Sequence, residues 1–117
     1  MVESYKDLKV WQRAIQMTLA VYRTSSSFPK EELFGLIGQM RRSSTAVATR
    51  IAERYGRGTP AEYRHYLGMA RGSNLELQTQ LVIVSELAYT DSKSITEIES
   101  LSAEVAKMLN TLLSKLQ

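Results

Sequence analysis

Cysteine is absent from this sequence of 117 residues, and histidine occurs once, at position 65. Without cysteine the chain can form neither a disulfide nor a thiolate metal site, and this composition fits a reducing compartment. We therefore expect a cytoplasmic protein. The single histidine, His65, also excludes any metal site that needs two imidazoles from one chain.

Long apolar runs are missing as well. LVIV at 81–84 is among the longest, whereas a membrane-spanning helix needs about 20 apolar residues. The opening residues, MVESYKDLKVW, lack the basic and then apolar layout of a signal peptide. We expect no membrane span and no leader, and the length fits a single domain over residues 1–117.

Apolar residues recur every three or four positions in four successive segments, and no alternating pattern indicates a strand. The stripes are Leu8, Trp11, Ile15, Leu19 and Tyr22; Leu33, Ile37, Met40, Ser44, Val47, Ile51 and Tyr55; Tyr63, Tyr66, Leu67, Ala70, Leu77, Leu81 and Val84; and Ile95, Ile98, Leu101, Val105, Met108, Leu109, Leu112 and Leu116. We also expect Phe28 and Phe34 to pack in the core or against a helix start. Because the connections are short, we expect an all-α fold, an up-down-up-down antiparallel four-helix bundle.

The boundary between the second and third segments carries specific signals. Gly56 and Gly58 tolerate positive φ and favour the end of a helix there. Thr59, Pro60 and Glu62 predict the next helix start, with Thr59 as N-cap, Pro60 as the first helical residue and Glu62 completing a capping box. Upstream, Pro29 followed by two glutamates predicts the start of the second helix.

Several stretches around this boundary resemble one known family. They are DLKVWQRAI at 7–15, FPKEELFGLIGQMRRSS at 28–44, IAE at 51–53, YGR at 55–57 and ARGS at 70–73. These residues resemble the four-helix-bundle proteins encoded within intervening sequences of 23S ribosomal RNA genes. The resemblance implies a ring-like homo-oligomer, typically a pentamer, with no known enzymatic activity. The family is in turn similar to accessory proteins of diversity-generating retroelements, basic rings thought to hold a reverse transcriptase and its RNA.

The chain departs from that family's pattern at three positions. Ala48 stands where proline is usual, Arg50 where asparagine is usual and Arg54 where glycine is usual. Two of the three changes add positive charge. Because the usual asparagine and glycine are absent, a function that depends on either of them is in doubt.

The third segment is apolar on more than one side. Leu75, Val82 and Ile83 lie outside its main stripe, and a helix that is apolar most of the way round is buried on several sides. Either it contacts all three other helices, or these three residues form a subunit interface. Of these two alternatives, we expect that the three residues form a subunit interface.

Positive charge gathers in the middle of the chain. Residues 35–72 hold seven arginines against two glutamates, a net charge of +5. The predicted patch consists of Arg42, Arg50, Arg54, Arg57, Arg64 and Arg71, with Tyr55 nearby to stack on a base. At about 100° per residue the arginines of helix two share one flank, and Arg64 and Arg71 share a face of helix three. Such a patch favours an oligomeric scaffold that binds RNA or a nucleic-acid-protein complex.

The same arginines permit other roles. They can cover the core with their stems and pair with neighbouring acids, join subunits, or bind an acidic protein surface. The alternative is therefore a protein-interaction or assembly module. RNA binding would weaken steeply with added salt, and arginines that join subunits would not respond to RNA.

Catalytic patterns are poorly represented. Glu62 and His65 have the Glu-x-x-His spacing of di-iron bundles, but those sites need two such motifs. The glycine turn lacks the lysine of a phosphate loop, and no strand-turn-helix presents a nucleophilic serine. We expect no catalytic residue, no metal, no cofactor and no small-molecule substrate.

Overall fold

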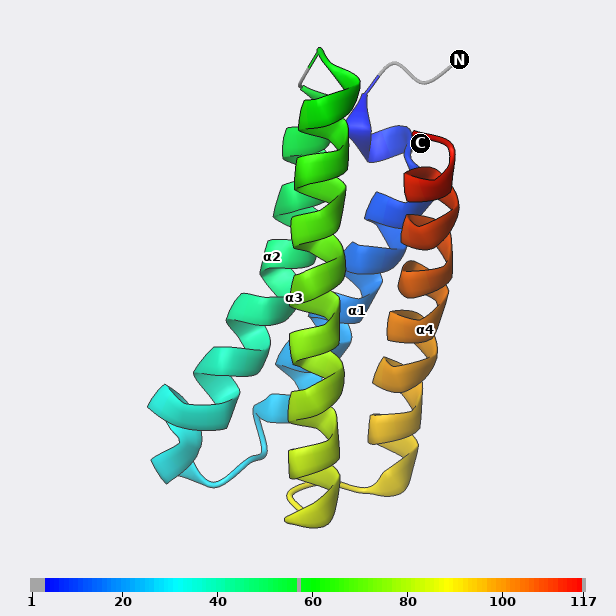
Figure 1. The fold of residues 1–117 in the computed structure, drawn as a ribbon. Coiled ribbons are helices and arrows are strands. Elements are labelled where there is room, and N and C mark those ends of the chain that lie inside the picture. The colour runs from blue at the N-terminus through cyan, green and yellow to red at the C-terminus, as the bar shows by residue number, and fades with distance from the viewer. Residues whose placement is uncertain (1–3, 57, 117) are drawn as a thin grey trace.

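The computed structural model describes residues 4–56 and 58–116, which form a bundle of long antiparallel helices (Figure 1). The helices are α1 (Lys9–Ser25), α2 (Gly38–Tyr55), α3 (Pro60–Glu86) and α4 (Ser92–Ser114), with short turns η1 (Tyr5–Asp7), η2 (Lys30–Glu32) and η3 (Leu33–Ile37). Each helix packs on its neighbours in sequence, and α1 closes the bundle against α4. The all-α, four-helix prediction is confirmed. Within residues 4–56 and 58–116, none of the helices combines the length and the apolar composition that a bilayer span requires.

The core lies along the axis where the helices meet. Its largest fully buried side chains are Met17, Met40, Ile51, Leu67, Leu77, Leu81, Ile98 and Leu109. The predicted stripes of helices two, three and four supply most of it, but Leu33 of the second stripe is 50% exposed because it lies in the irregular turn before α2. The stripe predicted for the first helix is partly wrong, because Leu19 is 53% exposed and Tyr22 is 44% exposed. The core face of α1 instead carries Val10, Ala14 and Met17.

The start of helix two differs from the prediction. After Pro29 the chain forms a 3₁₀ turn and a single π turn, and regular α2 begins only at Gly38. Glu32 holds the irregular segment, since its Oε1 accepts from the Leu36 N–H at 3.3 Å and its Oε2 accepts from the Tyr89 hydroxyl at 2.7 Å. Phe28 is buried as expected, but Phe34 is 91% exposed, so its assignment to packing was wrong.

The boundary between α2 and α3 is built largely as predicted. The Thr59 hydroxyl accepts from the Glu62 N–H at 3.1 Å, and Pro60 is the first helical residue. Gly56, however, has a φ of −82°, and none of the described glycines has a positive φ. The turn therefore needs no left-handed glycine.

The left-handed residue in the described chain is Ala88, with φ 55°. The Ala88 N–H donates to the Ser85 carbonyl at 3.1 Å, and the Tyr89 N–H donates to the Val84 carbonyl at 3.3 Å. These two bonds are those of a Schellman motif, whose left-handed position usually holds glycine. An alanine there carries a steric cost from its Cβ.

A buried polar network joins α3 to α4. The Asn74 amide donates to the Ser102 carbonyl at 3.0 Å, and the Ser102 hydroxyl donates to Asn74 Oδ1 at 2.8 Å. Gln78 Nε2 also donates to the Ser102 hydroxyl at 2.9 Å. Because both Asn74 and Ser102 are buried, these bonds select one register between the two helices.

Replacing Asn74 by alanine should lower the free energy of unfolding by about 1–3 kcal/mol, because it leaves buried groups of Ser102 without a partner. Urea unfolding at a fixed protein concentration, followed by circular dichroism, measures the change. Asn110→Ala is the matched control, since Asn110 is exposed on α4, and it should change stability by less than about 0.5 kcal/mol. Equal losses in the two variants would contradict the role of the network.

Replacing Ala88 by glycine should raise the free energy of unfolding by about 0.5–1 kcal/mol, since the left-handed conformation no longer strains a Cβ. The same substitution at Ala103, which is exposed on α4, should lower the free energy of unfolding by about 1 kcal/mol, because glycine is unfavourable inside a helix. Thermal unfolding of both variants should show a gain of stability at position 88 and a loss at position 103. A loss at position 88 as large as the loss at position 103 would exclude the strain.

Candidate interaction surfaces

The arginines of α2 have different surroundings. Arg50 Nη1 lies 2.7 Å from Glu53 Oε1, one turn away on the same helix. The guanidinium of Arg54 lies 4.6 Å from the centre of the Tyr63 ring, across the boundary to α3. Thus both arginines that depart from the family pattern have partners within the chain. Arg42 is exposed, and none of the described residues forms a hydrogen bond or ion pair with it.

The arginines of α3 turn toward α4. Arg64 Nη1 donates to the Leu116 carbonyl at 2.8 Å, and Arg71 Nη1 donates to Asn110 Oδ1 at 3.4 Å. Arg42 instead lines hollows on the α2 side of the bundle, one of them shared with a residue of α1 and one with residues of α3, so it lies on the other side of α3 from these contacts to α4. The structure does not bring the predicted residues into one patch. Tyr55 is half-buried at the end of α2, and Arg57 lies outside the described residues.

Arginines outside the predicted patch also join helices. Arg13 Nε lies 2.7 Å from Glu104 Oε1, and Arg23 Nη2 lies 3.2 Å from Glu97 Oε1, so both connect α1 to α4. On the other side of α1, the Arg41 guanidinium lies 4.5 Å from the centre of the Tyr22 ring. Much of the arginine content is therefore used within the bundle.

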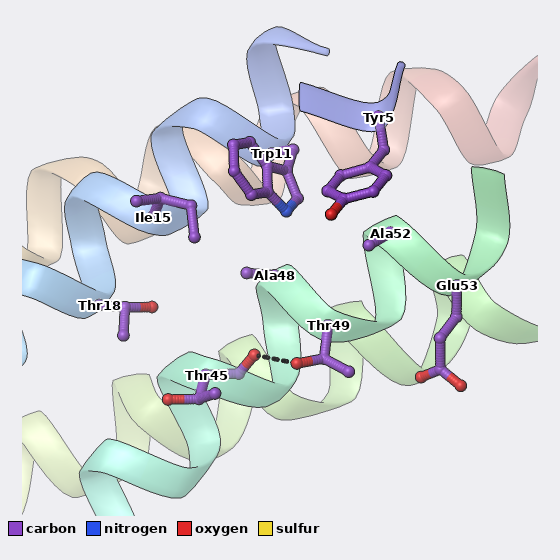
Figure 2. Close-up of a pocket in the computed structure, with 9 residues that line it drawn as sticks. All are labelled: Tyr5, Trp11, Ile15, Thr18, Thr45, Ala48, Thr49, Ala52 and Glu53. Atoms are coloured by element: carbon purple, nitrogen blue, oxygen red, sulfur yellow. Dashed lines mark hydrogen bonds between the residues drawn. The ribbon is translucent and has the colours of Figure 1, made fainter. Parts of the chain in front are cut away.

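A groove runs between α1 and α2 (Figure 2). At one end it is a hollow of about 450 Å³, with Trp11 and Ile15 on the α1 side and Ala48 and Ala52 on the α2 side. The Tyr5 and Trp11 rings meet edge to face, with their centres 5.3 Å apart. This end is apolar and aromatic. Its remaining lining residues are Thr18, Thr45, Thr49 and Glu53.

The groove continues toward the other end of the bundle and becomes basic. A second hollow shares Thr45 and Thr49 with the first and is also lined by Tyr22, Arg41, Arg42, Ala46 and Arg50. We call the two hollows together the α1–α2 groove. The apolar stripe predicted for the first helix largely lies here, because Trp11, Ile15 and Tyr22 line the groove and not the centre of the core.

The outer side of α3 is a second apolar surface. Leu75 is 56% exposed, Val82 is 57% exposed and Ile83 is 43% exposed. One and two turns before Leu75 are Gly72 and Gly68, where an added Cβ would meet no atom within 4 Å. We call these five residues with Thr79 the α3 outer face. The structure thus exposes the three residues that the sequence assigned to a subunit interface.

The Glu-x-x-His pair takes part in local contacts. Glu62 Oε1 accepts from the Thr59 hydroxyl at 2.9 Å, and the His65 ring packs edge to face on Tyr66 at 5.2 Å. Among the described residues, no three His, Cys, Asp or Glu side chains gather in a way that could hold a metal ion.

Comparison with known proteins places the chain in one family. No curated protein matches it. A crystal structure of a protein of unknown function from the S23 ribosomal protein family of Bacteroides thetaiotaomicron superposes with a TM-score of 0.80 at 19% identity, covering 89% of this chain and 97% of that one. This likeness shows a shared fold. The family model of the 23S rRNA-intervening sequence protein matches residues 6–111, and the chain therefore belongs to the 23S rRNA-intervening sequence protein family.

Proposed function

We propose that this protein is a non-catalytic assembly module whose copies associate through the α3 outer face. The exposure of Leu75, Val82 and Ile83 carries the proposal. The opposite side of α3 is buried in the core through Leu67, Leu77 and Leu81. A helix with one buried side normally presents charged and polar residues to water, whereas α3 also exposes three large apolar side chains.

The composition of the face supports this role. Gly68, Gly72, Leu75, Thr79 and Val82 follow one another at intervals of three or four residues along α3, and none is charged. Such a strip can approach another helix closely, since glycine has no side chain to hold the helices apart. Burial of a fully exposed leucine or valine contributes about 1.5–3 kcal/mol. Three partly exposed side chains per subunit therefore supply a substantial driving force for association.

The surroundings of the arginines favour assembly over nucleic-acid binding. The nucleic-acid hypothesis depended on one patch shared by helices two and three. Arg64 and Arg71 instead contact α4, and Arg50 is paired with Glu53. The ion pair with Glu53 competes with phosphate for Arg50, and the contacts to α4 direct Arg64 and Arg71 away from the arginines of α2.

Glutamate at both Leu75 and Val82 should convert the assembly to a monomer of 13.2 kDa, because association would then bury unpaired carboxylates. Light scattering during size-exclusion chromatography measures the mass, and circular dichroism checks that the helices persist. Ala103→Glu, which adds one charge to the exposed side of α4, should leave the mass unchanged. A monomeric wild type, or a double variant that still assembles, would refute the proposal.

Addition of a short structured RNA at low salt distinguishes an assembly module from a nucleic-acid-binding protein. An assembly module should elute at the same mass with and without RNA. If RNA joins the complex and Arg42→Glu with Arg50→Glu abolishes its binding at unchanged protein mass, the nucleic-acid function is the correct one. Lys93→Glu with Lys107→Glu lowers the net charge by the same amount at exposed positions of α4 and controls for overall charge.

A further inference from the structure

We propose that the α1–α2 groove binds an amphipathic helical segment of a partner protein, and that this segment is apolar at one end and acidic at the other. The groove is separate from the surface proposed for assembly, because no residue of the α3 outer face lines it. Binding of a partner in the groove therefore does not depend on assembly through α3.

The shape of the groove suits another helix. Its uncharged lining residues on α2 are all small, so a second helix can approach the floor closely. They are Thr45, Ala46, Ala48, Thr49 and Ala52. The opposite wall is formed by α1 and runs from Trp11 to Tyr22. At a rise of about 1.5 Å per residue this wall is about 16 Å long, the length of roughly three helical turns.

One end of the groove provides an apolar anchoring site (Figure 2). The Trp11 ring is half-buried and packs edge to face against the Tyr5 ring, and Ile15 lies one turn further along α1. Aromatic side chains in a well-packed hollow are typical of the residues that dominate the free energy of a protein interface. A large apolar side chain of the partner, inserted at this end, would cover the parts of Trp11 and Ile15 that remain exposed.

The other end of the groove is extended by a third hollow. This hollow shares Arg41 with the groove and adds Lys30 to its rim. The Arg41 guanidinium is held in place, since its Nε donates to the Ser25 hydroxyl at 3.0 Å and it lies 4.5 Å from the centre of the Tyr22 ring. A guanidinium that is ordered in advance loses less conformational entropy when it binds a carboxylate.

Positive charge predominates toward this end. The groove and the third hollow have a net charge of +3, from four cations and one anion. These are Lys30, Arg41, Arg42 and Arg50 against Glu53. The side chains of Lys30 and Arg42 form no hydrogen bond or ion pair with any described residue. Charge complementarity therefore favours carboxylates in the partner segment, and these carboxylates belong opposite Lys30, Arg41 and Arg42.

The distribution of charge favours a peptide over a nucleic acid. Glu53 is the charged residue at the apolar end, and it is paired with Arg50 at 2.7 Å. A nucleic-acid strand carries a phosphate on every nucleotide, so a strand along the groove would place phosphates beside Glu53 and over the apolar end. A peptide can confine its acidic residues to one end and its apolar residues to the other. Amphipathic helices bind hydrophobic grooves in this way, with apolar anchors at three- and four-residue spacing.

Selection from a peptide library tests the inference. The probe is a phage-displayed library of random peptides of about 16 residues, long enough to cover the groove and the third hollow as a helix. The library lacks tryptophan and is selected on the full chain. Enriched peptides should carry large apolar residues in one half and aspartate or glutamate in the other half. Enrichment of peptides without this polarity, or of no peptide, would overturn the inference.

Trp11 reports where an enriched peptide binds, because it is the single tryptophan of the chain. A peptide that covers the apolar end should shift the emission of Trp11 to shorter wavelength, since the indole leaves water. Thr45→Tyr with Thr49→Tyr fills the groove at exposed positions and should abolish both the shift and the binding. Thr96→Tyr with Ser100→Tyr makes the same change at exposed positions of α4 and should bind the peptide like the wild type. Circular dichroism checks that both variants keep their helices, and a peptide that still binds the filled groove would contradict the inference.

Charge reversal tests the acidic end separately. Lys30→Glu with Arg42→Glu should weaken binding of the same peptide by about tenfold or more, because both substituted side chains would then repel its carboxylates. Lys93→Glu with Lys107→Glu changes the net charge equally at exposed positions of α4, and it should weaken binding by less than about threefold, because distant exposed charges are screened by salt. Equal weakening in the two variants would indicate general attraction alone and would overturn the inference.

The remaining outcomes separate this inference from the assembly function. Leu75→Glu with Val82→Glu alters only the α3 outer face, so this variant should bind the enriched peptide with unchanged affinity whether or not it assembles. Loss of peptide binding in this variant would show that the peptide needs α3 and would overturn the inference, while the mass of the variant still tests the assembly. If a short structured RNA displaces the peptide and the filled groove no longer binds that RNA, the groove is a nucleic-acid site and the inference is overturned as well.

Discussion

A helix in a four-helix bundle can turn only one side to the core, and the structure depends on that constraint. In α1 the core side carries mostly small residues, among them Val10, Ala14 and Ala20, which let the other helices approach closely. Its larger residues, Trp11 and Tyr22, are displaced to the side that lines the α1–α2 groove. In α3 the displaced apolar residues are Leu75, Val82 and Ile83. Two apolar surfaces therefore remain outside the core, and the one on α3 is the surface through which copies are proposed to associate.

The arginines follow from the same arrangement. Long side chains beside a core seam can cover it with their stems and still reach a neighbouring helix with their charged ends. Arg13 and Arg23 reach α4 from α1, and Arg64 and Arg71 reach α4 from α3. Glu97 and Glu104 of α4 pair with the two arginines of α1, whereas the two arginines of α3 reach a main-chain carbonyl and an amide oxygen on or just beyond α4. A net excess of arginine in the sequence is therefore no measure of the charge available to an external ligand.

Sequence patterns predicted most of the fold. The helix start at Thr59 and Pro60 was readable because its signals are local, as are the stripes of α2, α3 and α4. Periodicity predicted the buried side of α1 incorrectly, because Leu19 and Tyr22 continue the regular apolar spacing but are exposed. It also passed over Asn74 and Ser102, since polar residues in a core position interrupt an apolar stripe. In α1, large apolar residues alternate with small core residues, and this signal could have predicted the apolar side of α1 that lines the α1–α2 groove.

The number of helices, their connections and the family follow from the sequence, because they depend on spacing, caps and local motifs. Leu75, Val82 and Ile83 could also be recognised in the sequence as apolar residues outside the main stripe of α3. The buried side of α1 and the partner of each arginine become known only when the helices are packed together. They depend on how closely neighbouring helices can approach, and that distance is set by side chains far apart in the chain. The groove exists for the same reason, since α1 and α2 form it together.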